Sequence, residues 1–503
     1  MKRFFFQLFL LCSSSFVLFA QTSTDALRFS QFGIGGTART IAIGGSIGAL
    51  GADFSVISTN PAGLGTYRGS EFTMTPSLFL NKVEANLVDG GTSPISENKT
   101  NFNFNNIGVV FNRNIERDNS KWKTSNFAIG INRLTNFNET ISYSGQTRGS
   151  YADFFRESAA GLFPEDFNDF DNGLAWDVGL IFDDGEDGIY ESDSFYEPNA
   201  VLQKSETIER TGSINEVVFG IGGYRGEKMM IGATLGFPIV SFNERSVYQE
   251  EDVADDIPIF NSLQYTKDLD VSGYGLNLKV GLIYRVTSAL RVGAAIHTPT
   301  RLRLTDVYQT SLLHDFSGFI DSEGREVLSP LESSTPDDLT TIEYDLSTPW
   351  RFIGSGGFII KKRGFISGEV EFVNPSGARF KTPRRLDGSA TDNSIYNENN
   401  ESVANDLQSV VHFRVGGEYV IKKMRVRAGV NVSTTPYAGE TGTFNSYSTG
   451  FGYREKKFFV DVAYKLAPND DFFNPYPTLN SIPQVVETST TQSSLLVTLG
   501  FRF

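Results

Sequence analysis

The stretch YGLNLKVGLIYRV, from Tyr274 to Val286, decides the fold class because its apolar and polar side chains alternate. One face would carry Tyr274, Leu276, Leu278, Val280, Leu282, Tyr284 and Val286. The other would carry Gly275, Asn277, Lys279, Gly281 and Arg285, with Ile283 as its one apolar member. A period of two is that of a β-strand. The stretch is longer than the segment of about nine to eleven residues with which a tilted strand crosses a bilayer. It therefore predicts a membrane-spanning strand whose other face lines a water-filled interior.

The same alternation recurs along the rest of the chain. Turn signals divide the chain into about fourteen strands, near 69–86, 101–115, 122–145, 203–226, 228–250, 262–288, 289–312, 341–362, 364–381, 408–422, 424–437, 444–456, 457–471 and 485–503. A soluble sandwich also alternates, but it turns its apolar faces inward. An even number of strands and aromatic residues at their ends are typical of outer-membrane barrels. The predicted fold is therefore all-β, a transmembrane antiparallel barrel over residues 69–503.

The segment before these strands, GIGGTARTIAIGGSIGALGADFSVISTNPAGLG at residues 33–65, is rich in glycine and carries few charges. Glycine raises the entropic cost of ordering a segment, so this one needs surrounding walls. It ends in Asn60-Pro61-Ala62-Gly63, whose residue types favour a turn. An ordinary surface turn has the same chemistry. Its place directly before the strands favours the interpretation that residues 21–68 form a hatch, or plug, inside the barrel.

Residues 1–20 have the layout of a secretory signal peptide, with Lys2 and Arg3 before an apolar core and Ala20 at its end. The core is shorter than the about twenty residues of a membrane helix. The net charge of −15 argues against nucleic acid as a partner. The single cysteine, Cys12, falls within the signal segment, so no disulfide is expected.

Long polar segments predict extracellular loops at 151–200, 313–340 and 382–406, the first with helical pieces at 151–160 and 166–181. Short basic turns such as Lys422-Lys423 would lie in the periplasm. The acidic run at 183–187 resembles half a calcium loop but lacks its third and twelfth ligands. Neither a metal site nor a cofactor is therefore expected.

The chain resembles the FadL/TodX family in four features. These are the glycine-rich start that closes on Asn60-Pro61-Ala62, a total of about fourteen strands, the helical outer loop and the terminal Phe503. Members of this family are outer-membrane transporters for long-chain fatty acids and aromatic hydrocarbons. The resemblance implies a hatch that carries Asn60, Pro61 and Ala62. It also implies that hydrophobic molecules enter from outside, rest in an apolar pocket and leave sideways through a kinked strand. Only the Asn-Pro-Ala neighbourhood matches as a motif, so the family's ligand-binding residues do not map onto this chain.

Six basic residues fall on the inward faces of the predicted strands: Lys279, Arg285, Arg291, Arg414, Arg425 and Arg427. One interpretation is a salt-bridged lumen in which Glu369, Glu371, Glu418 and Asp461 balance them. The other is that an arginine binds a carboxylate head group while the tail lies on apolar hatch residues. The candidate tail contacts are Ile41, Ile43 and Leu50.

The function that follows is passive uptake of a hydrophobic small molecule across the outer membrane of a Gram-negative bacterium, by a monomer without enzymatic activity. Membrane lipid and lipopolysaccharide would surround it, and the assembly machinery would read Phe503. One alternative is a barrel that docks secreted proteins, as in type IX secretion; a general porin is disfavoured by the plug. Another is a lipid hydrolase built on Ser46 in the motif Gly44-Gly-Ser46-Ile-Gly48, which needs a partner among His297, His314 and His412. The run from Gly33 to Ala38 fits a dinucleotide fingerprint but lacks the surrounding βαβ unit.

Overall fold

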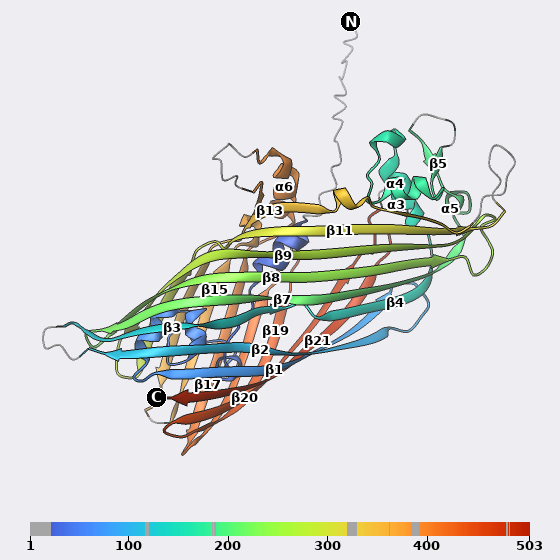
Figure 1. Ribbon diagram of the computed structural model, residues 1–503. Coiled ribbons are helices and arrows are strands. Elements are labelled where there is room, and N and C mark those ends of the chain that lie inside the picture. The colour runs from blue at the N-terminus through green and yellow to red at the C-terminus, as the bar shows by residue number, and fades with distance from the viewer. Residues whose placement is uncertain are drawn as a thin grey trace, which may run out of the picture.

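The computed structural model describes residues 22–503 except 116–119, 184, 186–187, 319–328, 362, 384–391, 479–480 and 482. The predicted signal peptide at 1–20 lies outside the described residues, as do parts of the loops at 313–340 and 382–406. The described chain is a long barrel with helices inside it and at one end (Figure 1). None of its described helices is both long enough and apolar enough to cross a membrane.

One hydrogen-bonded sheet contains nineteen strands. They are β1 (Glu71–Leu87), β2 (Ile95–Asn114), β3 (Trp122–Asn136), β4 (Glu139–Arg148), β7 (Val201–Arg225), β8 (Met229–Glu251), β9 (Phe260–Arg285), β10 (Leu290–His297), β11 (Arg301–Phe316), β12 (Leu331–Ser334), β13 (Thr341–Ser347), β14 (Arg351–Ile359), β15 (Gly364–Val373), β16 (Arg379–Lys381), β17 (Val410–Ile421), β18 (Met424–Thr434), β19 (Thr443–Arg454), β20 (Phe458–Phe473) and β21 (Val486–Arg502). A separate pair is β5 (Phe182–Asp183) with β6 (Tyr190–Glu191).

The α-helices are α1 (Ser23–Ser30), α2 (Ala38–Ala42), α3 (Tyr151–Ala159), α4 (Asn172–Asp177), α5 (Asp193–Tyr196) and α6 (Asn397–Asp406). Short 3-10 helices are η1 (Phe54–Ile57), η2 (Pro61–Thr66), η3 (Pro164–Asp166), η4 (Asp337–Leu339), η5 (Pro375–Gly377) and η6 (Ser394–Tyr396). The helix predicted at 151–160 is α3, whereas the one predicted at 166–181 is reduced to α4.

The sheet closes because its first strand pairs with its last, Glu71 lying opposite Arg502 and Leu87 opposite Val486. The predicted antiparallel barrel of fourteen strands is confirmed. The predicted single strands 122–145, 289–312, 341–362 and 364–381 are each broken, into β3/β4, β10/β11, β13/β14 and β15/β16. Pro299, Pro349 and Pro375 stand at the last three breaks. Proline has no N–H to donate, so a ladder is interrupted where it stands.

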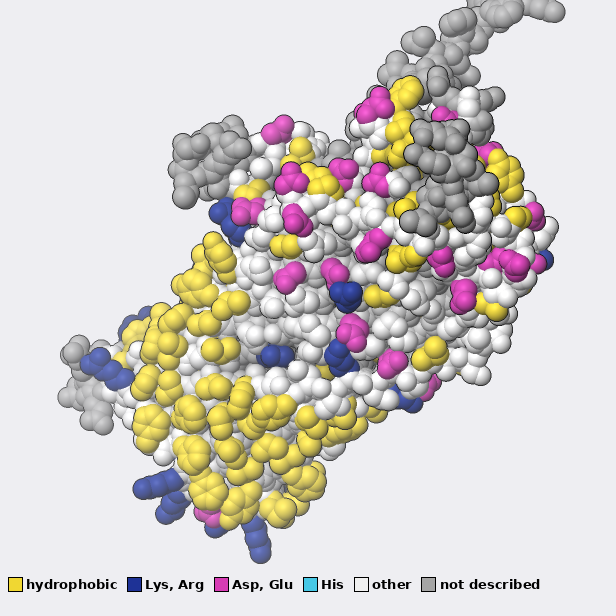
Figure 2. Space-filling model, turned by 45° about the vertical axis from the view of Figure 1, so that its right-hand side comes forward, with side chains coloured by type: hydrophobic (Ala, Val, Ile, Leu, Met, Phe, Trp, Pro, Cys, Tyr) yellow, Lys and Arg dark blue, Asp and Glu magenta, His cyan; other side chains and the backbone are white. Residues whose placement is uncertain are grey.

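The apolar face of β9 points outward, as its alternation predicts. Leu278 is 42% exposed, whereas its neighbours Asn277 and Lys279 are 5% and 6% exposed. Outward apolar side chains cover one half of the barrel as a broad belt, and Lys and Arg gather at the end of that half (Figure 2). Beyond the belt the outward positions of β9, such as Asp270 and Ser272, are polar. The surface is that of a transmembrane barrel whose strands continue past the bilayer.

Residues 22–67, the N-terminal segment, pack against inner walls of the barrel. Helix α2 contacts β18–β21, whereas η2 contacts β3 and β7–β9. Wall glycines allow this close approach: a Cβ on Gly416 would lie 2.2 Å from the carbonyl oxygen of Ile43, and one on Gly232 would lie 2.2 Å from that of Pro61. The segment thus touches two different parts of the wall and is held between them.

The cap at the loop end of the barrel has its own apolar core. Tyr151 and Phe155 of α3 pack with Leu174 of α4 onto Tyr248 and Tyr265, which belong to β8 and β9. Aromatic contacts join these layers, with ring centroids 4.9 Å apart for Tyr151 and Tyr248 and 5.3 Å apart for Phe155 and Tyr265. The predicted loop 151–200 is therefore a packed cap on the strands.

Candidate functional site

The Asn60-Pro61-Ala62 turn is fully buried between the N-terminal segment and the wall. Asn60 Nδ2 donates hydrogen bonds to the carbonyl oxygens of Gly48 (2.7 Å) and Leu282 (3.3 Å), and Asn60 Oδ1 accepts one from Ala62 N at 3.2 Å. Pro61 begins η2, where the missing N–H costs nothing. Gly281 of β9 leaves room for the amide, because a Cβ there would lie 1.9 Å from Asn60 Oδ1. Asn60 therefore ties two stretches of the N-terminal segment to the barrel.

Asp53 is a second polar node within the N-terminal segment, and the sequence patterns did not single it out. Its carboxylate accepts hydrogen bonds from Thr37 Oγ1 (2.8 and 2.9 Å), Thr40 Oγ1 (3.1 Å) and Ser55 N (3.0 Å). Arg39 lies 3.7 Å from Glu418 of the wall. These contacts give the segment a defined shape despite its glycine content.

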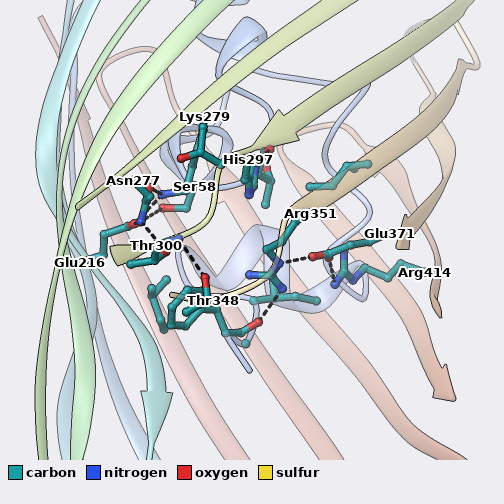
Figure 3. Close-up of a pocket in the computed structure, with 18 residues that line it drawn as sticks. Ser58, Glu216, Asn277, Lys279, His297, Thr300, Thr348, Arg351, Glu371 and Arg414 are labelled. Atoms are coloured by element: carbon teal, nitrogen blue, oxygen red, sulfur yellow. Dashed lines mark hydrogen bonds and ion pairs between the residues drawn. The ribbon is translucent and has the colours of Figure 1, made fainter. Parts of the chain in front are cut away.

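A small polar chamber of about 40 Å³ lies between the N-terminal segment and the wall (Figure 3). Lys279 Nζ is ion-paired to Glu216 at 2.5 Å, and Glu371 lies 2.6 Å from Arg351 and 2.5 Å from Arg414. The chamber holds about one or two water molecules. Two of the six basic residues predicted to bind a ligand, Lys279 and Arg414, are thus already paired with carboxylates.

The other predicted basic residues also have partners within the protein. Arg427 contacts Glu418 and Asp461, each at 2.7 Å. Arg285 donates to Tyr224 Oη (2.8 Å) and Arg291 to the carbonyl oxygen of Leu50 (2.7 Å), whereas Arg425 reaches the backbone carbonyls of Lys422 and Met424. The salt-bridged lumen is the arrangement seen at Arg414 and Arg427. The ligand-binding role of the basic residues stays a prediction.

The lumenal cavity, about 910 Å³ in volume, adjoins the polar chamber, and Phe32, Gly33 and Ile34 line both. Ile41 lines this cavity, and the other eight residues predicted to touch a ligand do not. Ile43 and Leu50 belong instead to a buried core between the N-terminal segment and the barrel wall. The volume of the cavity falls in the range of pockets for small organic ligands. Its lining is mixed, with Phe79, Phe444 and other apolar side chains beside amides, hydroxyls and the cations Arg133 and Lys465. Neither cation was among the residues predicted to bind a ligand, although Lys465 lies on the inward face of a predicted strand.

The barrel wall bends inward beside this cavity. Strand β3 ends at Asn136 and β4 starts at Glu139, with a register shift against β7 near Leu134. Strand β4 then packs on the inner face of β1: Gln146 N donates to the carbonyl oxygen of Gly90 at 2.8 Å, and Ile141 packs in one core with Val83. The third barrel strand therefore separates from β2 at Phe137-Asn138 while it stays paired with β7.

The bend leaves one edge of β2 without a ladder partner. Strand β2 pairs with β3 from Asn106 to Asn114, and in the described chain β4 pairs with β7 alone. We refer to this unpaired edge at 95–105 as the lateral opening. Phe102 points outward there and is 64% exposed, while Asn103 and Asn105 line the lumenal cavity. Phe102 and Phe104 belong to the apolar belt, whereas the outward residues Ser96, Asn98 and Thr100 are polar, so the edge lies beside lipid only near Phe102 and Phe104. Unpaired backbone in lipid is costly.

The motif around Ser46 does not form a nucleophilic site. Ser46 is buried, and its Oγ contacts the carbonyl oxygen of Ile43 (2.9 Å) and Ser367 Oγ (2.8 Å). His297, His314 and His412 contact the Thr59 carbonyl, the Val178 carbonyl and Ser433 Oγ instead. Within the described residues no group of three or more His, Cys, Asp or Glu side chains is placed to hold a metal; residues 184, 186 and 187 of the acidic run lie outside them.

Asp171, the N-cap of α4 in the cap, is buried, and burial raises the pKa of its carboxyl to about 6. The folded state therefore binds this proton more tightly than the unfolded chain does. The stabilisation is present in full below about pH 4 and is lost as pH rises through about 6. The cap is thus more stable in mildly acidic than in neutral medium.

Comparison with solved structures finds chains that share the fold of this barrel. A FadL homologue from Pseudomonas aeruginosa aligns with a TM-score of 0.56 at 12% identity over 94% of this chain and 100% of that one. The toluene transporter TbuX from Ralstonia pickettii aligns at 0.51 and 15% identity, and the toluene transporter TodX from Pseudomonas putida at 0.50 and 12%, each over 94% of this chain and 100% of its own. Comparison with family models and with curated protein sequences finds no match. The chain therefore has the FadL/TodX fold, as the resemblance predicted.

Proposed function

We propose that the protein is an outer-membrane channel for passive uptake of hydrophobic small molecules, which bind in the lumenal cavity and leave through the lateral opening into lipid. The observation that carries this proposal is the unpaired edge of β2 at 95–105, which borders the cavity on one side and exposes Phe102 on the other. A bend that served stability alone would leave no backbone unpaired beside lipid. A path by which the ligand leaves into lipid explains why this backbone is unpaired.

We further propose that residues 21–68 act as the hatch that closes the barrel toward the periplasm. The buried hydrogen bonds of Asn60 and the contacts of α2 and η2 with different parts of the wall support this role. The basic turns would then face the periplasm and the cap the exterior. Such a hatch keeps bulk water from crossing while a ligand leaves sideways.

Transport of this kind needs no catalysed reaction and no cofactor. Burying about 300 Å² of apolar surface favours binding by roughly 7 kcal/mol at about 25 cal/mol per Å², and release into lipid keeps that surface out of water. The structural neighbours TodX and TbuX are toluene transporters, and a third is a FadL homologue. Long-chain fatty acids or aromatic hydrocarbons are therefore the proposed cargo.

A disulfide across the lateral opening tests the proposal. Asn136 Nδ2 lies 3.4 Å from Asn101 Oδ1, so Asn101→Cys with Asn136→Cys places two thiols at the bend. The predicted mature chain has no other cysteine. We expect oxidation to abolish uptake of a labelled fatty acid or of toluene by cells, and reduction to restore it.

The control is Arg113→Cys with Ser125→Cys, which lie directly opposite each other on the intact β2–β3 ladder. Oxidation of this pair leaves the lateral opening free, so uptake should persist. Full uptake with the Asn101–Asn136 pair oxidised would show that the cargo leaves by another route.

A further inference from the structure

Five polar side chains on β20 and β21 face the lumenal cavity without a partner inside the protein. This polar panel consists of Lys465, Asn469, Thr490, Gln492 and Ser494. No side-chain hydrogen bond or ion pair joins any of them to another residue in the part of the chain that the structure describes. They therefore keep their full hydrogen-bonding capacity for whatever fills the cavity.

The strand register makes the panel compact. Lys465 lies directly opposite Ser494, Ala467 opposite Gln492, and Asn469 opposite Thr490. Inward positions recur every second residue, so the panel extends about 14 Å along the strands and about 5 Å across them. Its size is that of a polar head group.

Several other polar side chains around the cavity are paired with one another, whereas Arg133, like Lys465, has no carboxylate partner in the described part of the chain. Arg210 contacts Glu139 at 2.6 Å, Ser77 Oγ donates to Asn103 Oδ1 at 2.6 Å, and His412 contacts Ser433. Lys465 differs from these paired residues because none of the described carboxylates lies within ion-pair distance of it. An ammonium group that has no carboxylate partner inside the protein favours an anionic ligand.

The panel borders an apolar surface. On β21 the inward positions change from Ser494 to Leu496, which shares a buried cluster with Ile41 and packs against Ile34 of the N-terminal segment. Polar and apolar surfaces thus meet along one strand. An amphiphile can place its head on the panel and its tail on this surface.

We propose that the polar panel binds the head group of an amphiphile that combines one negative charge with several hydroxyl groups, such as a phosphorylated polyol. The inference rests on the proposed function and narrows its cargo. A hydrocarbon satisfies none of the five side chains, and a plain fatty acid satisfies only Lys465. A phosphorylated polyol supplies an anion for Lys465 and donors and acceptors for the two amides and two hydroxyls.

Four ligands with the same twelve-carbon chain test the proposal on the purified full-length protein by calorimetry or native mass spectrometry. They are lauroyl glycerophosphate, dodecyl phosphate, lauroyl glycerol and lauric acid, which separate the charge from the hydroxyl groups. We expect lauroyl glycerophosphate to bind at least about tenfold more tightly than each of the others, the gain of one good polar interaction.

Variants assign the effect to the panel. Thr490→Val and Gln492→Leu should each weaken lauroyl glycerophosphate about tenfold and leave lauric acid unchanged, whereas Lys465→Met should weaken every anion and spare lauroyl glycerol. Thr488→Val is the matched control on the same strand face, because Thr488 Oγ1 already donates to the carbonyl oxygen of Asp471. This control should bind all four ligands as the wild type does.

Two results would contradict the head-group proposal. Equal affinity for lauric acid and lauroyl glycerophosphate, unchanged by Thr490→Val and Gln492→Leu, overturns the head-group proposal and leaves the channel proposal standing. Failure of all four ligands to bind overturns the head-group proposal and excludes fatty acids as cargo, and the channel proposal is then decided by toluene uptake with the Asn101–Asn136 disulfide. The comparison among ligands on the wild type needs no variant, so it holds even where a substitution impairs folding.

Discussion

Asn60 makes three hydrogen bonds in a site that excludes solvent, and Gly281 of β9 is what makes room for it. Glycine is required here by space: a Cβ would meet Asn60 Oδ1 at 1.9 Å and Ala62 N at 3.2 Å. Displacing the amide would leave the Gly48 carbonyl buried and unpaired. The site therefore depends on a wall residue as much as on the Asn-Pro-Ala motif.

Gly281→Ala is expected to loosen the N-terminal segment, because leaving a buried group unpaired costs about 1–3 kcal/mol. Amide hydrogen exchange in residues 48–66 should be faster than in the wild type. Gly354→Ala on β14 is the control, since a Cβ there meets nothing within 4 Å. Equal protection in the two variants would mean that Asn60 does not anchor the segment.

At the scale of single elements, β9 changes character along its length. Its outward face is apolar from Tyr274 to Val286 and polar at Ser272 and Asp270, although both parts are strand with the same alternation. The apolar part matches a bilayer of about 30 Å at about 3.3 Å per residue with tilt. The polar part stands in water above it.

Two substitutions on this one face separate lipid from water. Leu278→Arg should destabilise the folded barrel in lipid vesicles by roughly 2–4 kcal/mol, because it places a charge near the bilayer midplane. Ser272→Arg, six positions away on the same face, should cost almost nothing. Urea unfolding followed by tryptophan fluorescence measures both, and equal costs would show that the belt does not face lipid.

The whole molecule is much longer than a membrane is thick. Strand β9 has 26 residues, about 85 Å when extended, so the cap projects well beyond the lipid. The cap and the basic turns lie at opposite ends of the barrel. The barrel can therefore cross the membrane in two orientations, with the cap outside the cell or with the cap in the periplasm. Residue labels distinguish the two.

A membrane-impermeant maleimide should label Ala254→Cys, in the segment between β8 and β9, on intact cells. It should label Lys456→Cys, in the short turn before β20, only after the outer membrane is permeabilised. The natural Cys12 falls in the predicted signal peptide, so the background is low. Labelling in the reverse order would invert the proposed orientation and assign the cap to the periplasm.

The chain's local pattern was enough to predict the barrel wall. Alternation identifies which side chains of a strand share a face, and Leu278 outward with Asn277 inward follow from it directly. The breaks at Pro299, Pro349 and Pro375 were readable in principle, because each proline removes a ladder donor. The break at Phe137-Asn138 carried no such signal, although it creates the lateral opening.

The class of fold, the even count of strands and the outward belt can be predicted from the chain alone, because alternation and turn signals are local patterns. What the inward residues do depends on the closed barrel, because most of their partners come from other strands or from the N-terminal segment. Arg427 of β18 meets Asp461 of β20, Asn277 of β9 donates to Glu216 of β7, and Lys465 is left facing the cavity. Alternation distinguishes inward from outward side chains, but the contacts among the inward side chains form only when the barrel closes.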